Sequence, residues 1–338
     1  MNQSKLPGLS VAIGIALVAT LAERALPIPL VGASIIALFI GMGMNSFAPS
    51  STGLEAGLTF TSKTILKFAI VLLGASLSIG TILEVGKLSL SVMFFTLLTC
   101  FGGGYFVGKA LKLDWKLSNL ISAGTGICGG SAIAAIAPVI DAKESDIAYA
   151  MSATFLFDVA MILLFPLMGR AIGMSNQAYG LWAGTAINDT SSVVAAGYAF
   201  SEAAGDFATM VKLTRTLSII PTVLIFSAIQ YTLTQKKTQE SPTQTHKKVS
   251  LLSLFPWFIV LFVGMALLNS AGWIPSMLSR FLKQTSKFLM VAALAAIGLK
   301  TDLKEMRQSG LNPMFHGFII SALVVVVALG VEKWMGLL

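Results

Sequence analysis

Hydrophobic residues fill long runs of this sequence, and most charged residues lie in the short stretches between the runs or near the ends of the runs. A helix needs about 20 consecutive apolar residues to cross a bilayer, and most of the runs approach that length. The pattern predicts eleven membrane-spanning segments, at residues 7–23, 29–48, 62–84, 88–111, 117–140, 145–170, 177–200, 204–232, 251–270, 276–299 and 312–334. Residues 233–250 are polar almost throughout, and we expect a flexible cytoplasmic linker there.

The composition agrees with an all-α polytopic membrane protein that forms a single unit over residues 1–338. Of the 338 residues 55% are hydrophobic and 11% are charged, whereas about a quarter of a soluble domain is charged. The formal net charge of +8 comes from Lys and Arg in short loops, which is typical of orientation signals and argues against nucleic acid as a partner. These residues are more frequent on the amino-terminal side, so we predict a cytoplasmic amino terminus.

The sequence lacks the patterns of common catalytic and metal sites. Cys100 and Cys128 both lie in apolar runs, without metal-ligand spacing, and the two histidines are His246 and His316. No phosphate-binding glycine loop and no nucleophile–base set is recognisable. We therefore expect a protein that is not an enzyme and that needs neither a metal nor a cofactor.

A string of small and polar residues occurs twice. Residues 123–135 read AGTGICGGSAIAA, and residues 183–195, sixty positions later, read AGTAINDTSSVVA. The first copy holds four glycines within seven residues, and each costs up to about 1 kcal/mol in a helix interior relative to alanine. Glycines at this spacing can also mediate close helix packing without a break, which is the interpretation we prefer for residues 102–108.

The second copy favours broken helices. Its five consecutive polar side chains, at residues 188–192, would not be tolerated on a lipid-facing or simply packed helix. Unwound backbone in a membrane survives where protein or a water-filled cavity surrounds it. Matching interruptions in two repeats point to the substrate site of a transporter, and we place the substrate-binding core at residues 117–232.

Four charged residues fall well within the predicted spans, away from the span ends: Asp158, Asp189, Lys212 and Arg215. Such residues usually face the bundle interior and have partners. Either the two cations form ion pairs with the aspartates and hold the bundle together, or they line the cavity and bind an anion. Lys67 and Lys287 lie nearer helix ends, where we expect them to snorkel, and we expect His316 to be a hydrogen-bonded packing residue.

The expected substrate-binding residues come from the two strings and from the cationic helix face. A small anion would face the backbone and hydroxyl groups of the strings, and Asp158 and Asp189 would serve coupling to protons or sodium. The substrate-binding candidates are Thr125, Gly126, Cys128, Gly129, Gly130, Ser131, Asn188, Asp189, Thr190, Ser191, Ser192, Lys212 and Arg215.

Taken in order, several strings resemble the YeiH-type family of sulfate exporters. They are GTGICGGSAIAAIAPVI, AKESDIAYA, GLWAGTAINDTSSVVAAG, VKLTRTL and KFLMVAALAAIGLKTDL, and the resemblance covers roughly residues 8–334. It implies export of sulfate or another anion across the bacterial inner membrane. Family members are expected to carry His before the aspartate, where this chain has Asn188, which weighs against a proton relay at that position.

A more distant resemblance concerns architecture. Residues 71–86 and 293–310 are similar to the scaffold helix of cation–proton antiporters, which implies the crossed-helix, inverted-repeat fold of those proteins and of bile acid symporters, with an elevator motion. One span separates 117–140 from 177–200, so the two segments should run in the same direction, whereas crossed helices run oppositely. A re-entrant segment, a miscounted span and a parallel repeat remain open at this point.

The leading hypothesis is a secondary transporter of a small anion, such as sulfate or an organic anion, which works by alternating access. A cation–proton antiporter that uses Asp158 or Asp189 is the alternative, and a channel is the third candidate. The sequence does not fix the oligomeric state, although a homodimer is compatible with this architecture.

Overall fold

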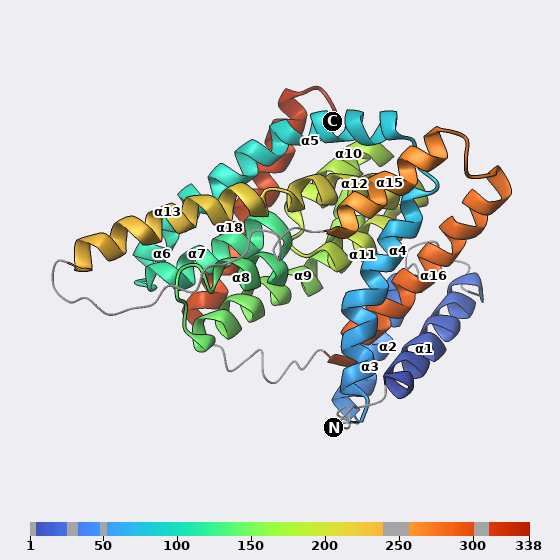
Figure 1. Ribbon diagram of the computed structural model, residues 1–338, viewed down its shortest axis with the longest axis horizontal. Helices are drawn as coiled ribbons and strands as arrows, with labels where there is room; N and C mark the ends of the chain where they lie inside the picture. Colours follow the sequence, from blue (N-terminus) through green and yellow to red (C-terminus); the bar gives the residue numbers. More distant parts are fainter. Residues whose placement is uncertain (1–4, 26–32, 48–52, 239–256, 301–310) are drawn as a thin grey trace.

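The computed structural model describes residues 5–25, 33–47, 53–238, 257–300 and 311–338, and within these ranges every regular element is a helix. Seven of the helical stretches are long and apolar enough to cross a membrane. The chain is therefore an all-α polytopic membrane protein. Its helices form two groups that lie next to each other (Figure 1).

The first group, which we call the α16 bundle, combines helices from the first quarter of the chain with two helices from residues 257–300. A methyl group at Gly41 on α2 would lie 2.5 Å from the Ala295 carbonyl oxygen on α16, so these two helices pack backbone against backbone. The members are α1 (Leu6–Ala25), α2 (Ala33–Phe47), α3 (Glu55–Phe60), the π-helical turn η1 (Thr61–Ile65), α4 (Leu66–Gly74), α15 (Trp257–Ser270) and α16 (Ser276–Lys300).

The second group, which we call the α9 bundle, contains both copies of the repeated string. Its members are α5 (Ile79–Leu98), η2 (Thr99–Gly103), α6 (Gly104–Ala110), α7 (Trp115–Ala123), η3 (Gly124–Cys128), α8 (Gly130–Ile136), α9 (Glu144–Ile172), α10 (Asn176–Ala186), α11 (Thr190–Phe200), α12 (Glu202–Thr216), α13 (Ile219–Thr238) and α18 (Leu311–Trp334). The two bundles share one large apolar cluster, to which Leu73 of α4, Phe262 of α15 and Met290 of α16 belong. They also meet in a smaller cluster made of Leu38, Met42, Ile162, Ala195, Ala199 and Leu294.

The predicted span 62–84 does not correspond to one helix. The helical stretch begins earlier, at Glu55, and ends at Gly74; the chain then turns, and α5 begins at Ile79 after the N-cap Ser78, whose Oγ accepts a hydrogen bond from the Thr81 amide. Polar partners from α15 and α16 bind the turn, since Asn269 Nδ2 donates to the Leu77 carbonyl and Ser279 Oγ to that of Ala75. The apolar pattern continues through the turn and hides it in the sequence.

The polar stretch 233–250 also differs from its prediction in part. Helix α13 continues to Thr238, so the first six residues of the predicted linker are helical, and 239–250 lie outside the described residues. Five of these six residues are polar, and polar residues can continue a helix because the helix satisfies its own backbone hydrogen bonds. At the other end of α13, a turn at Leu217 and Ser218 separates it from α12 within the predicted span 204–232.

Candidate functional site

The first repeated string folds as a helical hairpin. Gly129 has φ +63° and ψ −134°, a conformation that reverses the chain between η3 and α8. The two arms then lie side by side, because a methyl group at Gly124 would lie 2.9 Å from Ile133 Cδ1. At the open end of the hairpin, Lys116 Nζ donates a hydrogen bond of 2.7 Å to the Asp141 carbonyl.

The second string forms an equivalent hairpin from α10 and α11. Tyr179 Oη donates to the Ala196 carbonyl at 3.0 Å, and the Tyr179 ring stacks on Phe200 with 3.9 Å between centroids. At the open end, Ser201 Oγ donates to Asn176 Oδ1 at 2.7 Å. Asn176 and Ser201 are each sixty positions after Lys116 and Asp141, so the repeat extends to the contact that closes each hairpin.

The two hairpins make the repeat an inverted one. Their arms contain 7 to 14 residues, the longest being α7 with η3. At 1.5 Å per residue a 14-residue arm is about 21 Å long, which is too short for a bilayer core of about 30 Å. Helix α9, with 29 residues, is long enough to cross. The hairpins therefore enter from opposite faces, and of the three alternatives left open by the sequence the re-entrant one holds, for both segments.

The tips of the hairpins meet. A methyl group at Gly129 would lie 2.9 Å from Asp189 Oδ1 and 3.2 Å from Asp189 Cα. Asp189 is the N-cap of α11, and its Oδ2 accepts hydrogen bonds from the amide and the hydroxyl of Ser191. Interrupted backbone from both repeats is thus brought together at one place inside the α9 bundle.

Two buried cations hold the carbonyl ends of the interrupted helices. Arg215 donates from Nε to the Gly126 carbonyl and from Nη2 to that of Thr125, both at 2.6 Å, and from Nη1 to the Ile187 carbonyl at 3.4 Å. Lys212 Nζ donates to the same Ile187 carbonyl at 2.9 Å. Positive charge is stabilised where unpaired carbonyl groups end a helix, and Arg215 connects both tips.

A buried carboxylate holds the amide end of the second tip. Asp158, on α9, accepts hydrogen bonds from the amides of Asn188 at 2.9 Å and Asp189 at 2.8 Å. These amides precede α11 and have no helical partner, so the negative charge lies where the helix dipole favours it. Among the described residues no ion pair joins the two aspartates to the two cations, because main-chain groups are their partners instead.

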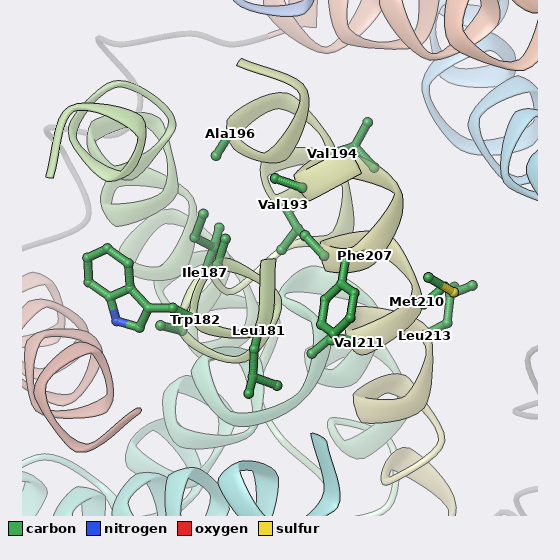
Figure 2. Close-up of a cluster of buried hydrophobic side chains, with 14 of the residues drawn as sticks. Leu181, Trp182, Ile187, Val193, Val194, Ala196, Phe207, Met210, Val211 and Leu213 are labelled. Atoms are coloured by element: carbon green, nitrogen blue, oxygen red, sulfur yellow. The ribbon is translucent and has the colours of Figure 1, made fainter. Parts of the chain in front are cut away.

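The orientation of the cations follows from the packing of α12. One face of this helix contributes Phe207, Met210, Val211 and Leu213 to an apolar cluster with Leu181 and Trp182 of α10 and Val193, Val194 and Ala196 of α11 (Figure 2). A methyl group at Gly184 would lie 2.7 Å from the Val211 side chain, so α10 and α12 approach closely. This packing fixes α12 against the hairpin and brings the last turn of α12 to the level of the tips.

The remaining candidates divide between buried and accessible positions. Thr125, Gly126, Cys128 and Gly129 are buried in the first tip, whereas Gly130 is partly exposed and Ser131 is exposed. In the second tip, Asp189 and Thr190 are partly exposed, and Asn188, Ser191 and Ser192 are buried. The tips thus reach the surface of the molecule through the first residues of α8 and α11.

Two fully buried polar atoms at the tips have no hydrogen-bond partner among the described residues: Thr125 Oγ1 and Asn188 Oδ1. Such atoms are costly in a protein interior and call for a partner, such as water or a ligand. The side-chain nitrogen of Asn188, Nδ2, donates to the Thr154 carbonyl at 3.4 Å and to Ser321 Oγ at 3.3 Å. Thr154 and Ser321 were missed in the sequence, because Thr154 contributes a main-chain carbonyl and a single hydroxyl such as that of Ser321 gives a weak signal within an apolar helix.

The glycines of residues 102–108 pack as expected in part. Methyl groups at Gly104 and Gly108 would lie 2.0 Å and 2.2 Å from the hydroxyls of Ser122 and Ser118, whereas Gly102 has open space. The prediction for His316 is confirmed, since its buried Nε2 lies 2.9 Å from Ser118 Oγ and 3.1 Å from the Gly104 carbonyl. These contacts dock α18 and α6 onto the first arm of the first hairpin.

The two lysines that were expected to snorkel behave differently. Lys67 is exposed and lies 5.7 Å from the centroid of the Phe258 ring. Lys287 instead forms an ion pair of 2.5 Å with Glu202. The carboxylate comes from Glu202, the first residue of α12, a juxtaposition that the sequence does not reveal.

We expect Asp158→Asn to lower the free energy of unfolding by about 2–5 kcal/mol. The amide can accept from one of the two backbone N–H groups but presents its own donor to the other, and the negative charge is lost. The shift of the unfolding midpoint in detergent measures the effect, with Glu84→Gln, an exposed carboxylate on α5, as the matched control. Equal midpoints for the two variants would contradict this role of Asp158.

Comparison with known proteins identifies relatives over nearly the whole chain. The profile of the family described as "Conserved hypothetical protein 698" matches residues 7–317. A UPF0324 membrane protein of Clostridium tetani is 56% identical over 336 residues, which cover 96% of this chain and 97% of that protein. UPF0324 membrane proteins of Streptococcus pneumoniae serotype 4 and Streptococcus mutans serotype c are 42% and 40% identical, with coverage of 91% and 98% of each chain.

These matches agree with the resemblance to YeiH-type proteins and with the apolar helices of the fold. The identity and the coverage leave no part of the two hairpins outside the similarity. On these grounds the chain is a multi-pass membrane protein that belongs to the UPF0324 family.

Proposed function

We propose that this protein is a secondary transporter that moves a small anion across the cytoplasmic membrane by alternating access. The observation that carries the proposal is the meeting of two inverted hairpin tips inside the α9 bundle, with Gly129 against Asp189. Interrupted helices at matching places in two inverted repeats form the substrate sites of many transporters.

An anion is the substrate class that the accessible part of the tips favours. Helix α11 has 11 residues, and its amino-terminal end is partly exposed at Thr190. Backbone N–H groups and the helix dipole at such an end favour negative charge. The buried, unpaired hydroxyl of Thr125 adds a further donor in the first hairpin tip. Sulfate and small organic anions fit this chemistry, and sulfate is suggested by the family resemblance.

Lys212 and Arg215 would act on the anion mainly through the backbone. They are 0% and 1% exposed, and their donors already bind carbonyl groups. Their charges keep the carbonyl ends of the interrupted helices from repelling an anion at the amide ends. Two positive and two negative side chains lie at the two hairpin tips, so an anion that binds there favours uptake of a proton or a sodium ion with it.

The cation–proton antiporter alternative has less support. Both carboxylate oxygens of Asp158 already accept backbone hydrogen bonds, and Asp189 Oδ2 is bound by Ser191. The two buried cations next to these groups raise the electrostatic cost of binding a metal cation. Sodium-dependent dissipation of an imposed pH gradient, followed with a dye in proteoliposomes without other anions, would favour the antiporter.

Counterflow of labelled anions in proteoliposomes tests the proposal. Vesicles loaded with sulfate should accumulate labelled sulfate, and unlabelled organic anions should compete where they share the site. Thr190→Asp should reduce the rate at least about tenfold by electrostatic repulsion, because aspartate is well tolerated in the first turn of a helix. Thr190→Asn is the matched neutral control and should keep most of the activity.

Two results would refute anion transport at the tips. One is that counterflow of every inorganic and organic anion tried is no faster than in protein-free vesicles, although the unfolding midpoint shows that the protein is folded. The other is an equal rate for Thr190→Asp and Thr190→Asn. Single-channel currents in a planar bilayer would favour the channel instead.

A further inference from the structure

Three ion pairs connect the α9 bundle to the α16 bundle. Lys283 Nζ, on α16, lies 2.6 Å from Asp206 Oδ2 and 3.0 Å from Glu202 Oε1, both on α12. Lys287 Nζ, one helical turn further along α16, lies 2.5 Å from Glu202 Oε2. The four side chains form a network in which Glu202 and Lys283 each bind two partners.

The network is attached to the second hairpin. Tyr198, on α11, donates from its hydroxyl to Asp206 Oδ1 at 2.6 Å, and Lys287 Nζ lies 5.8 Å from the centroid of the Tyr198 ring. A methyl group at Gly205 would lie 2.5 Å from Tyr198 Cδ1, so α11 and α12 are closely packed at this point. A displacement of the second hairpin relative to α16 must therefore break the ion pairs.

Helix α12 connects this network to the place where the two hairpin tips meet. Its first two turns carry Glu202 and Asp206, and its last turn carries Arg215, which binds the carbonyl groups of both tips. The helix is a single stretch of 15 residues between these points. Its two ends therefore move as one rigid element, and a change at the tips is transmitted to α16.

The network has no full counterpart in the first repeat. Sixty positions before Asp206 stands Asp146, but the positions that correspond to Tyr198 and Glu202 are Pro138 and Ala142. Pro138 and Ala142 cannot provide a hydroxyl or a carboxylate. An inverted repeat allows two conformations in which the repeats exchange roles about a pseudo-two-fold axis, and these ion pairs stabilise one of them more than the other.

We infer that Glu202, Asp206, Lys283 and Lys287 form an electrostatic latch that holds the α9 bundle against the α16 bundle in the present conformation and opens when the bundles move during transport. The inference rests on the proposed alternating access. A single exposed ion pair contributes little, but a network of partly buried pairs across an interface that moves biases the equilibrium between two states.

The distance between the bundles tests the latch independently of transport. Nitroxide labels on cysteines introduced at Leu21, on α1, and Phe106, on α6, report it, since both positions are exposed and the native Cys100 and Cys128 are buried. In the double variant Lys283→Met, Lys287→Met we expect the population of the present conformation to fall about tenfold relative to the other one. Lys87→Met, at an exposed position on α5, is the matched control and should leave the distances unchanged.

A charge exchange provides the second arm. Glu202→Lys alone should shift the distances as the lysine double variant does, and Glu202→Lys with Lys287→Glu should restore them at least in part, because an opposite pair forms again. High salt should shift the wild-type distribution in the same direction as the variants, since exposed pairs are screened.

The outcomes separate the latch from the proposed function. Unchanged distances in the lysine double variant, with a wild-type unfolding midpoint, would overturn the latch. Shifted distances in a protein that shows no anion counterflow would keep the latch and count against the anion transporter. Failure of the charge exchange to restore any of the wild-type distribution would also overturn the latch, provided that the exchanged protein is folded.

Discussion

Replacing Arg215 by methionine is expected to abolish anion counterflow and to lower the free energy of unfolding by about 3–5 kcal/mol. Methionine keeps much of the length and apolar volume but removes every donor. The carbonyls of Thr125 and Gly126 then lose the 2.6 Å bonds to the guanidinium, and the weaker contact with Ile187 is lost as well. Charge-assisted hydrogen bonds to buried groups are the most costly to remove.

Three variants complete this experiment. Arg215→Lys should recover part of the stability but little transport, because an ammonium group cannot bind two carbonyls of one tip and one of the other in a fixed plane. Lys212→Met should cost less than Arg215→Met, since Lys212 binds a single carbonyl. Arg280→Met, at an exposed position on α16, is the control. If Arg215→Met unfolds at the same temperature as Arg280→Met, the bridging role of Arg215 is wrong.

Alanine substitutions at Gly129 and Gly130 are expected to have opposite effects on stability. Gly129 has φ +63° and ψ −134°, a conformation that costs a residue with a side chain about 1–3 kcal/mol. Its added methyl group would also lie 2.9 Å from Asp189 Oδ1. Gly129→Ala should therefore separate the two tips, destabilise the protein and stop counterflow.

The adjacent glycine offers a closely matched control. Gly130 is the first residue of α8, and a methyl group there would contact only the Met151 Cε atom, at 3.9 Å. Gly130→Ala should be neutral or stabilise the helix by up to about 1 kcal/mol. Both unfolding midpoints can be measured in the same detergent. Equal midpoints for the two variants would mean that the first tip does not have the reversed backbone described here.

Some features of the site could be predicted from single positions and their spacing. The sixty-residue repeat, the glycines of the first string and the polar run 188–192 predicted two interrupted helices, and both interruptions are present. The four charged residues within apolar runs were also found, because a charge in a membrane span is rare enough to stand out. These are local signals, and each depends on a few neighbouring residues.

The hydrogen-bond partners of those residues could not be predicted from the sequence. The sequence favoured ion pairs or an anion as partners of Lys212 and Arg215, whereas the cations bind carbonyls at Thr125, Gly126 and Ile187. A carbonyl group occurs in every residue, so no residue type marks it as an acceptor. Thr154 was missed for the same reason, since it also contributes its carbonyl. Ser321 was missed because isolated hydroxyls in apolar helices usually bond to their own backbone.

The sequence by itself determined that this is an all-helical membrane protein with two repeated interruptions, since the length of an apolar run and the cost of glycine in a helix are properties of the local chain. Only the tertiary structure decided that both interruptions are hairpins which enter from opposite faces and meet at Gly129 and Asp189. The physical reason is that a chain reversal and a continuous crossing present the same hydrophobic pattern. They differ only in contacts between residues about 25 positions apart, such as Lys116 with Asp141 and Asn176 with Ser201.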